Sequence, residues 1–358
     1  MWPIPGEALG GGAVQSALRE PPTYLRRRYR LALLGLGVVL PLVLLMGAGL
    51  GAYPIPPLEI PRILWKREEP AYGVLVSIRF PRVLLAALVG ALLALGGGVM
   101  QGLFGNLLAD PGLIGVSSGA ALGAAFFIVL VPGSGALEVY ALPLMAFVGT
   151  LLATLLVWAL ASHAERVQVL TLLLAGIAIN AVAGAMIGFL VSRATDEQIR
   201  SLTFWTLGGY GGATWGLLTS ILPLALFSLW GLLRLWRPLN ALVLGESEAF
   251  HLGVDLASFK RLAVALAALG VGSAVAAAGS VGFIGLVAPH LFRLLAGPDH
   301  RYLLPGSTML GAVLSLLADL VARTAAAPAE LPVGVVTSLL GGPFFIFLLL
   351  RHKREVPR

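Results

Sequence analysis

The chain alternates between long apolar runs and short segments that carry most of its charged residues. A helix needs about 20 mainly apolar residues to cross ~30 Å of hydrocarbon, and this length predicts an all-α integral membrane protein with about ten transmembrane helices. The eighth run is short, follows a break at Gly279-Ser280 and contains Pro289, which indicates a broken or re-entrant helix. The ten runs are 31–52, 81–104, 112–131, 140–161, 168–191, 206–233, 261–279, 282–297, 303–324 and 332–350.

Composition supports a membrane protein over a soluble one. Hydrophobic residues make up 58% of the 358 residues and charged residues 11%, against about 25% charged in an ordinary soluble domain. The 45 glycines lie within apolar runs, where small residues let transmembrane helices approach closely. The chain has no cysteine, which excludes disulfides and thiolate metal sites. The polar first thirty residues do not have the pattern of a cleavable signal peptide.

Basic residues are unevenly distributed between the two sides of the predicted bundle. The net charge is +7, but the basic residues lie in loops, which favours a membrane topology signal over a nucleic-acid partner. Both termini are predicted to be cytoplasmic, with residues 1–30 as an N-terminal segment, 31–351 as a ten-helix transmembrane domain and 352–358 as a tail. The cytoplasmic segments would hold Arg26–Arg28, Arg30, Arg166, Arg234, Arg237, Lys260, Arg261, Arg293, Arg301, Arg351, Lys353 and Arg354, and the outer ones Arg62, Lys66, Arg67, Arg79, Arg82, Arg193, Arg200 and Arg323.

The longest predicted internal loop, about 234–260, contains an amphipathic stretch from Leu244 to Val254. We expect a short helix closed by Gly253 as its C-terminal cap. Such a helix is often a simple connector, but its apolar positions could also fill a groove on a partner.

The chain holds no nucleotide-hydrolysis motif of its own. A phosphate loop ends in Gly-Lys-Ser/Thr, and none of the three lysines, Lys66, Lys260 and Lys353, follows a glycine. Asp319 is the one carboxylate well inside a run, and Arg323 is four residues later, which favours an intrahelical pair over ion coupling. The energy for any transport is therefore expected to come from another chain.

Two further groups have both an ordinary and a functional interpretation. His290 has no second ligand nearby in the sequence, which favours packing or hydrogen bonding over metal or haem ligation. Arg79-Phe80-Pro81-Arg82 lies at the predicted outer mouth of the second span. These arginines fit interfacial anchoring and docking of an acidic partner equally well.

Several motifs together resemble the permease family for iron-siderophore, haem and vitamin B12 import. The resemblance runs in order from about residue 58 to 351, with one departure at Leu107, where the family usually has proline. The motifs are Arg79–Arg82, Gly98–Asn106, Ala109–Gly119, Leu174–Asn180, Leu244–Ala249, Gly282–His290 and Ala329–Gly334.

The resemblance implies a vitamin B12 permease-like fold, that of a type II ABC importer, in the bacterial cytoplasmic membrane. It implies a homodimer in membrane lipid, two ATP-binding subunits that hold ATP and Mg²⁺, and an external substrate-binding protein. It implies no cofactor, metal or catalytic residue in this chain. By the same resemblance, Arg79, Arg82 and Arg323 would dock the binding protein, and Gly245, Glu246, Ala249, Leu252 and Gly253 would contact the ATPase.

The segment Ala194–Gly208 looks most like the haem permeases, so haem is the expected cargo, with ferric siderophore or cobalamin as alternatives. Arg193 could attract haem propionates, or it could pair with Asp196 or Glu197. An ion-coupled secondary transporter sensitive to Asp319 is a rival interpretation. An intramembrane enzyme is another, although no catalytic pair with suitable spacing is apparent.

Overall fold

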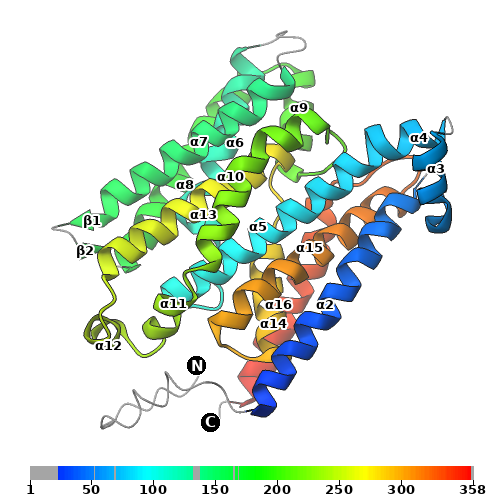
Figure 1. Ribbon diagram of the computed structural model, residues 1–358. Coiled ribbons are helices and arrows are strands. Elements are labelled where there is room, and N and C mark those ends of the chain that lie inside the picture. The colour runs from blue at the N-terminus through cyan, green and yellow to red at the C-terminus, as the bar shows by residue number, and fades with distance from the viewer. Residues whose placement is uncertain are drawn as a thin grey trace.

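The computed structural model describes residues 23–51, 53–67, 70–131, 138–163, 166–167 and 169–355, and it is almost entirely helical (Figure 1). Each of the ten predicted runs contains one main helix. These helices are α2 (Thr23–Gly49), α5 (Phe80–Phe104), α6 (Val116–Leu130), α7 (Glu138–Ala161), α8 (Val169–Val191), α10 (Trp215–Leu233), α13 (Leu256–Ala278), α14 (Ile284–Ala296), α15 (His300–Thr324) and α16 (Val333–Glu355).

Shorter elements connect these helices. Within the described residues, seven helices are long and apolar enough to cross a membrane, while α6, α14 and the described apolar part of α16 are shorter. The connecting elements are η1 (Pro57–Glu59), α3 (Ile60–Lys66), α4 (Ala71–Gly73), the π-helical η2 (Val74–Arg79), η3 (Pro111–Ile114), β1 (Ser162–His163), β2 (Arg166–Val167), α9 (Asp196–Leu207), α11 (Trp236–Leu242) and α12 (Glu246–His251).

The predicted sixth span, 206–233, is wrong at its beginning. Helix α9 ends at Leu207, Gly208 adopts a φ of +70°, and α10 begins only at Trp215 with Thr214 as its cap. The Gly208 carbonyl accepts a hydrogen bond from the backbone N–H of Val333, at 2.9 Å. A continuous helix would have to give up this turn, so the tertiary contact and the glycine conformation together separate α9 from α10.

The region around the predicted eighth span is interrupted as expected, but at one place only. Gly279 and Phe283 both have positive φ, +68° and +66°, and they bound the non-helical segment between α13 and α14. Helix α14 then continues through Pro289 as one helix of 13 residues. The interruption expected at the proline is therefore wrong, because the chain breaks before α14 and not within it.

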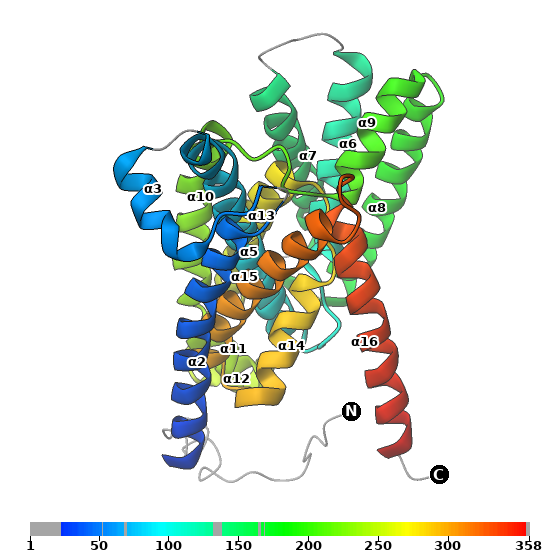
Figure 2. The same ribbon diagram turned by 90° about the vertical axis from the view of Figure 1, so that its right-hand side faces the viewer.

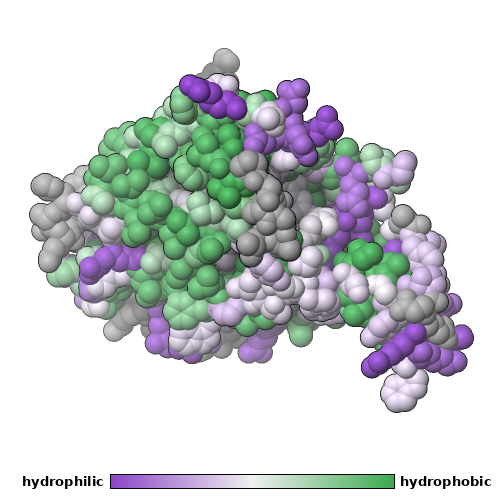
Figure 3. Space-filling model, turned by 90° about the horizontal axis from the view of Figure 1, so that it is seen from above, coloured by the Kyte–Doolittle hydropathy of each residue, from purple (hydrophilic) through white to green (hydrophobic). Residues whose placement is uncertain are grey.

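The antiparallel helices α5 and α15 form the centre of the bundle (Figures 1 and 2). In its most apolar window, the helix that includes α5 is 83% buried within the chain, against 17% for the peripheral α2. The start of α2 and the end of α16 lie at the same end of the molecule as α11 and α12, and α3 and α9 lie at the other end (Figure 2). Large apolar side chains cover much of the surface in Figure 3, as expected for helices that face lipid.

Helices α5 and α15 approach each other at glycines. A Cβ on Gly90 would lie 2.3 Å from the Gly311 carbonyl oxygen, and one on Gly311 would lie 2.4 Å from the Gly90 carbonyl oxygen. Both contacts are with backbone, which cannot rotate away as a side chain can. The absence of two Cβ atoms therefore sets the distance between the two central helices.

We predict that Gly90→Ala destabilises the protein by about 1–3 kcal/mol, because overpacking forces the two backbones apart. Thermal unfolding in detergent measures this effect. Gly35→Ala on α2 is the matched control, since nothing lies within 4 Å of a Cβ at that position. It should be neutral or stabilise by up to about 1 kcal/mol. Equal melting temperatures for the two variants would contradict the assignment of Gly90 to a tight contact.

Candidate functional site

Three arginines gather at the end of the bundle where α2 and α15 end and α5 begins. Arg79 is 5% exposed, and its guanidinium donates to the carbonyls of Ala48 and Gly49, both at 2.7 Å, and to the carbonyl of Tyr53. Arg79 therefore ties the segment after α2 to the beginning of α5. This placement makes it an internal crosslink in the isolated chain.

Arg82 and Arg323 share one buried carboxylate. Asp319 is 1% exposed, and it accepts hydrogen bonds from Arg82 Nε at 2.9 Å and Arg82 Nη2 at 2.8 Å. Arg323 Nε lies 3.6 Å from Asp319, and Arg323 Nη2 donates to the Gly47 carbonyl at 2.6 Å. The predicted pairing of Asp319 with Arg323 is confirmed, but the shorter bonds go to Arg82, which is 237 residues away in sequence.

Glu330 is the exposed member of this group. Its carboxylate lies 3.0 Å from Arg82 Nη1, and its side chain is 51% exposed whereas that of Arg82 is 9% exposed. In the arginine cluster, defined as Arg79, Arg82, Arg323, Asp319 and Glu330, the two carboxylates pair with Arg82 and Arg323, while Arg79 bonds to backbone carbonyls. An external carboxylate could reach Arg82 only by replacing Glu330, a competition that spacing in the sequence did not indicate because the two residues are 248 apart.

At the opposite end, α12 projects from the bundle and α11 lies beside it, against the ends of α5 and α15 (Figure 1). Helix α12 ends in a Schellman motif: Gly253 donates to the Phe250 carbonyl at 2.9 Å and Val254 to the Ala249 carbonyl at 3.0 Å. Gly253 has a φ of +85°, so its predicted role as the C-terminal cap is confirmed.

The residues expected to contact the ATPase differ in exposure. Ala249 is fully buried, Leu252 is half-buried, and Glu246 forms a 2.8 Å ion pair with Lys260. Gly245 has a φ of +115° and starts the helix. These residues shape α12, while Val243, 69% exposed, and Phe250, 67% exposed, project apolar side chains outward. The exposure of each side chain, which depends on the fold, therefore separates the residues that form α12 from the residues that a partner could contact.

Asp255 stabilises the segment that follows α12. Its carboxylate accepts a hydrogen bond from the Ser258 backbone N–H at 3.2 Å and caps α13. Hydrogen bonds from Ser258 hold the pKa of Asp255 below its usual value, and the bond from its side chain has a larger effect than the bond from its backbone. The carboxylate is therefore charged at neutral pH at the beginning of the helix, where a negative charge is favourable.

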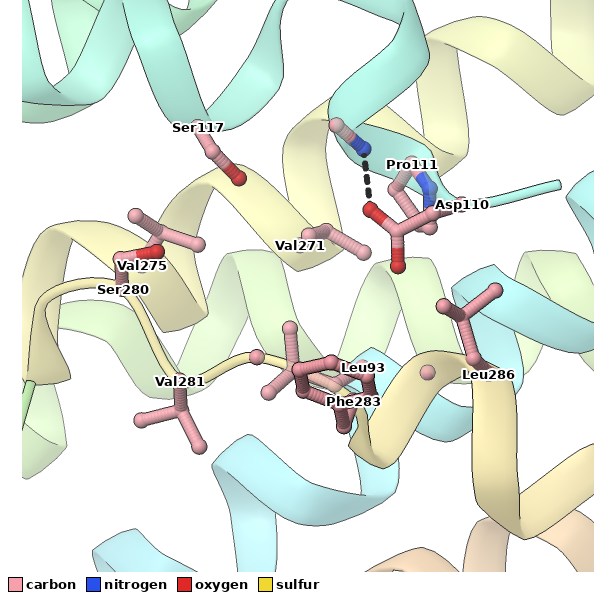
Figure 4. A pocket seen from close by; sticks show the side chains of 13 residues that line it. Leu93, Asp110, Pro111, Ser117, Val271, Val275, Ser280, Val281, Phe283 and Leu286 are labelled. Carbon is pink, nitrogen blue, oxygen red and sulfur yellow. Dashed lines mark hydrogen bonds between the residues drawn. The ribbon is translucent and has the colours of Figure 1, made fainter. Parts of the chain in front are cut away.

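A cavity of ≈ 230 Å³ lies between η3, α13 and the beginning of α14 (Figure 4). One Asp110 oxygen accepts a 2.7 Å hydrogen bond from the Gly112 backbone N–H, and the other faces the cavity beside Leu286. Pockets for drug-sized ligands occupy about 300–1,000 Å³. This cavity is therefore suited to a few water molecules and is too small for a tetrapyrrole.

Arg193 lies near the end of α8 and is exposed. Its guanidinium is 5.8 Å from the centre of the Phe189 ring. Asp196 and Glu197 occupy the first turn of α9, where they complement the helix dipole. Arg193 is thus placed at the same end of the molecule as the arginine cluster but outside it.

We predict that Asp319→Ala destabilises the protein by about 3–5 kcal/mol, because it leaves two arginines without their buried counter-charge. Glu330→Gln is the matched control: it removes an acid from the same cluster at an exposed position, where about 0–1 kcal/mol is expected. Chemical unfolding in detergent would compare the two variants. A small effect of Asp319→Ala would show that the arginines are neutralised in another way.

Comparison with known proteins relates this geometry to a family. Residues 39–351 match the FecCD transport family. The hemin transport system permease protein HmuU of Yersinia pestis is 45% identical over 88% of this chain and 95% of its own length. The vitamin B12 import system permease protein BtuC of Citrobacter koseri is 45% identical over 78% of this chain and 83% of its own.

A solved structure supports the same assignment. An inward-facing ABC transporter, assigned to the metal-chelate type, superposes with a TM-score of 0.80 at 34% identity and covers 89% of this chain and 98% of its own. The resemblance in the motifs and the all-α membrane fold are thereby confirmed. The chain belongs to the FecCD transport family and is a multi-pass permease subunit of an ABC importer, not an enzyme.

Proposed function

We propose that this chain forms half of a homodimeric, ATP-driven importer that moves haem across the bacterial cytoplasmic membrane. The observation that carries the cargo assignment is the 45% identity to a hemin permease over 95% of that protein. The vitamin B12 permease has the same identity over a shorter stretch, which makes cobalamin the second candidate. The metal-chelate type neighbour favours a ferric siderophore as the third.

A path between two copies fits the packing of the single chain. The cavity beside Asp110 is too small for a tetrapyrrole, and we therefore place the cargo path outside the individual bundle. Helix α8 is only 22% buried in its most apolar window. Its outward apolar side chains would then either line the path or contact the second copy, and α2 on the other side of the bundle would face lipid.

ATP would act from the end of the bundle that carries α11 and α12. Two separate ATP-binding subunits, which hold ATP and Mg²⁺, would seat the helix α12. Phe250 and Val243 are suited to a groove on this partner, because both are about two-thirds exposed and apolar. Hydrolysis would then move this end of the bundle and open the inner and outer mouths in turn, so α12 and both termini would be cytoplasmic.

The substrate-binding protein would dock at the opposite end, on the arginine cluster. A glutamate of the binding protein would take the place of Glu330 on Arg82, since a guanidinium pairs well with any carboxylate. Arg79 and Arg323 would shape the surface through their bonds to the carbonyls that follow or end α2. Arg193, exposed at this end, would attract the propionates of haem.

We predict that Glu330→Gln tightens docking of the binding protein by up to about fivefold, because an exposed ion pair of about 0.2–1 kcal/mol no longer competes. Binding to the permease in nanodiscs, measured by surface plasmon resonance, tests this. Glu59→Gln, an exposed acid outside the cluster, is the control and should leave the affinity unchanged. Weaker docking of Glu330→Gln would mean that Glu330 itself contacts the binding protein.

The cargo assignment is tested by uptake into proteoliposomes that contain this chain, its ATP-binding subunit and its binding protein. Haem, a ferric siderophore and cobalamin are offered in parallel, and we expect ATP-dependent accumulation of haem alone. Accumulation of another cargo would keep the importer and replace haem. Uptake that persists without the ATP-binding subunit and follows an ion gradient would overturn the ATP-driven mechanism.

A further inference from the structure

Asn240, near the end of α11, joins the projecting end of the molecule to the central helix α15. Its side-chain oxygen accepts hydrogen bonds from the His300 backbone N–H and the His300 ring Nδ1, both at 2.9 Å. Its side-chain nitrogen donates to Asp299 Oδ1 at 2.8 Å. One amide thus makes three bonds to the cap and the first residue of α15. Its orientation is fixed because its oxygen faces donors and its nitrogen faces an acceptor.

The residues that Asn240 holds also begin α15. Asp299 caps this helix, since its Oδ1 also accepts from the Arg301 backbone N–H at 2.9 Å. His300 is the first residue of α15 and is 4% exposed. A shift of α11 relative to α15 would therefore break the bonds between the half-buried Asn240 amide and the buried His300, together with the contact to the helix cap, and bonds to a buried partner are costly to lose.

Helix α5 closes the third side of this junction. A Cβ on Gly102 would lie 2.7 Å from His300 Nε2 and 2.9 Å from Leu239 Cδ2. Leu239 precedes Asn240 on α11 and is fully buried. The imidazole and the leucine are therefore packed directly on the α5 backbone, so α5, α11 and α15 meet at one point with no room for a side chain at position 102.

The same two helices, α5 and α15, carry the arginine cluster at their other ends. Arg82 is in the first turn of α5 and Asp319 in the last turns of α15, and the two side chains are bonded at 2.8 Å. Between the two ends, Gly90 and Gly311 hold the backbones in contact. A helix of 25 residues is about 37 Å long, so one tightly packed pair spans the distance between the two candidate docking ends.

Helix α11 is in turn close to α12, because only Val243, Leu244 and Gly245 separate them. Helix α12 is held from the other side by the Glu246–Lys260 ion pair at 2.8 Å. Any movement of α11 must therefore be taken up by three residues or passed on to α12.

We propose that Asn240 is a positioning residue that locks α11, and with it α12, to the paired helices α5 and α15, so that a displacement at the arginine cluster reaches the ATPase contact. The functional roles of the two ends rest on the proposed function, whereas the lock itself does not. Neither Asn240 nor His300 stood out in the sequence, because they are 60 residues apart.

The lock is tested first without any partner. The chain has no cysteine, so spin labels can be placed uniquely at Val243→Cys and Leu317→Cys, which replace exposed residues of the α11 end and of α15. The doubly labelled chain is mixed with an excess of unlabelled chain, so that a homodimer carries one labelled copy. Pulsed electron paramagnetic resonance in nanodiscs should then give one narrow distance distribution, with a separation on the order of 25 Å. Asn240→Ala should broaden it.

Thr150→Val is the control for a general loss of stability, since it removes a fully buried interhelical hydrogen bond elsewhere in the bundle, the 3.0 Å bond from Thr150 Oγ1 to the Val116 carbonyl. It should leave the distribution narrow even if it lowers the melting temperature as much as Asn240→Ala does. A distribution that Asn240→Ala leaves unchanged overturns the lock. Asn240→Ser, which keeps a hydroxyl but reaches fewer partners, replaces it if Asn240→Ala is not folded, with the same expected outcomes.

The second measurement uses the complete importer in proteoliposomes and counts ATP hydrolysed per haem taken up. Asn240→Ala should raise this ratio about fivefold, the lower range of ordinary coupling effects, while Thr150→Val leaves it unchanged. A broadened distance with an unchanged ratio overturns the transmission role. If the parent chain shows no ATP-driven uptake while Asn240→Ala still broadens the distance distribution, the proposed function is refuted but the positioning role of Asn240 is supported.

Discussion

The close approach of α5 and α15 is the constraint on which the rest of the structure depends. Two glycines, Gly90 and Gly311, let the backbones touch, and in an apolar solvent such contacts replace the hydrophobic effect as the source of helix association. The other helices are arranged around this pair, from the central α13 to the peripheral α2. The pair crosses the molecule from end to end. A displacement of the arginine cluster at one end can therefore be carried to α11 at the other end.

The charged groups at the ends of this pair follow from the same constraint. Arg82 and Asp319 come together only because α5 and α15 are antiparallel and in one register, and burial then makes each of them costly without the other. Glu330 is exposed and adds little to stability by comparison. One cluster thus contains a buried structural pair and an exposed carboxylate, and this difference is what the proposed docking of a partner at this surface would use.

The opposite end shows the same division between groups that hold the fold and groups that face outward. Ala249 and Leu239 are fully buried, whereas Phe250 projects from the molecule. Asn240 belongs to the first set by its bonds, but it connects the projecting helices to the central pair. In the proposed importer, which relies on a separate ATP-binding subunit, such a connection would transmit movement between the two partners.

The sequence by itself determined the class of protein, because apolar runs of bilayer length and motifs in order along the chain are local properties. It also determined the Gly253 cap and the break after Gly279, since glycine conformation depends on few neighbours. Only the tertiary structure decided that Asp319 binds Arg82, that Asn240 binds His300, that Phe250 is exposed and that α9 and α10 are separate. These features join residues far apart in the chain or depend on which face of a helix is covered. Such information arises only when the helices pack, because no run of neighbouring residues specifies which distant backbone will lie against it.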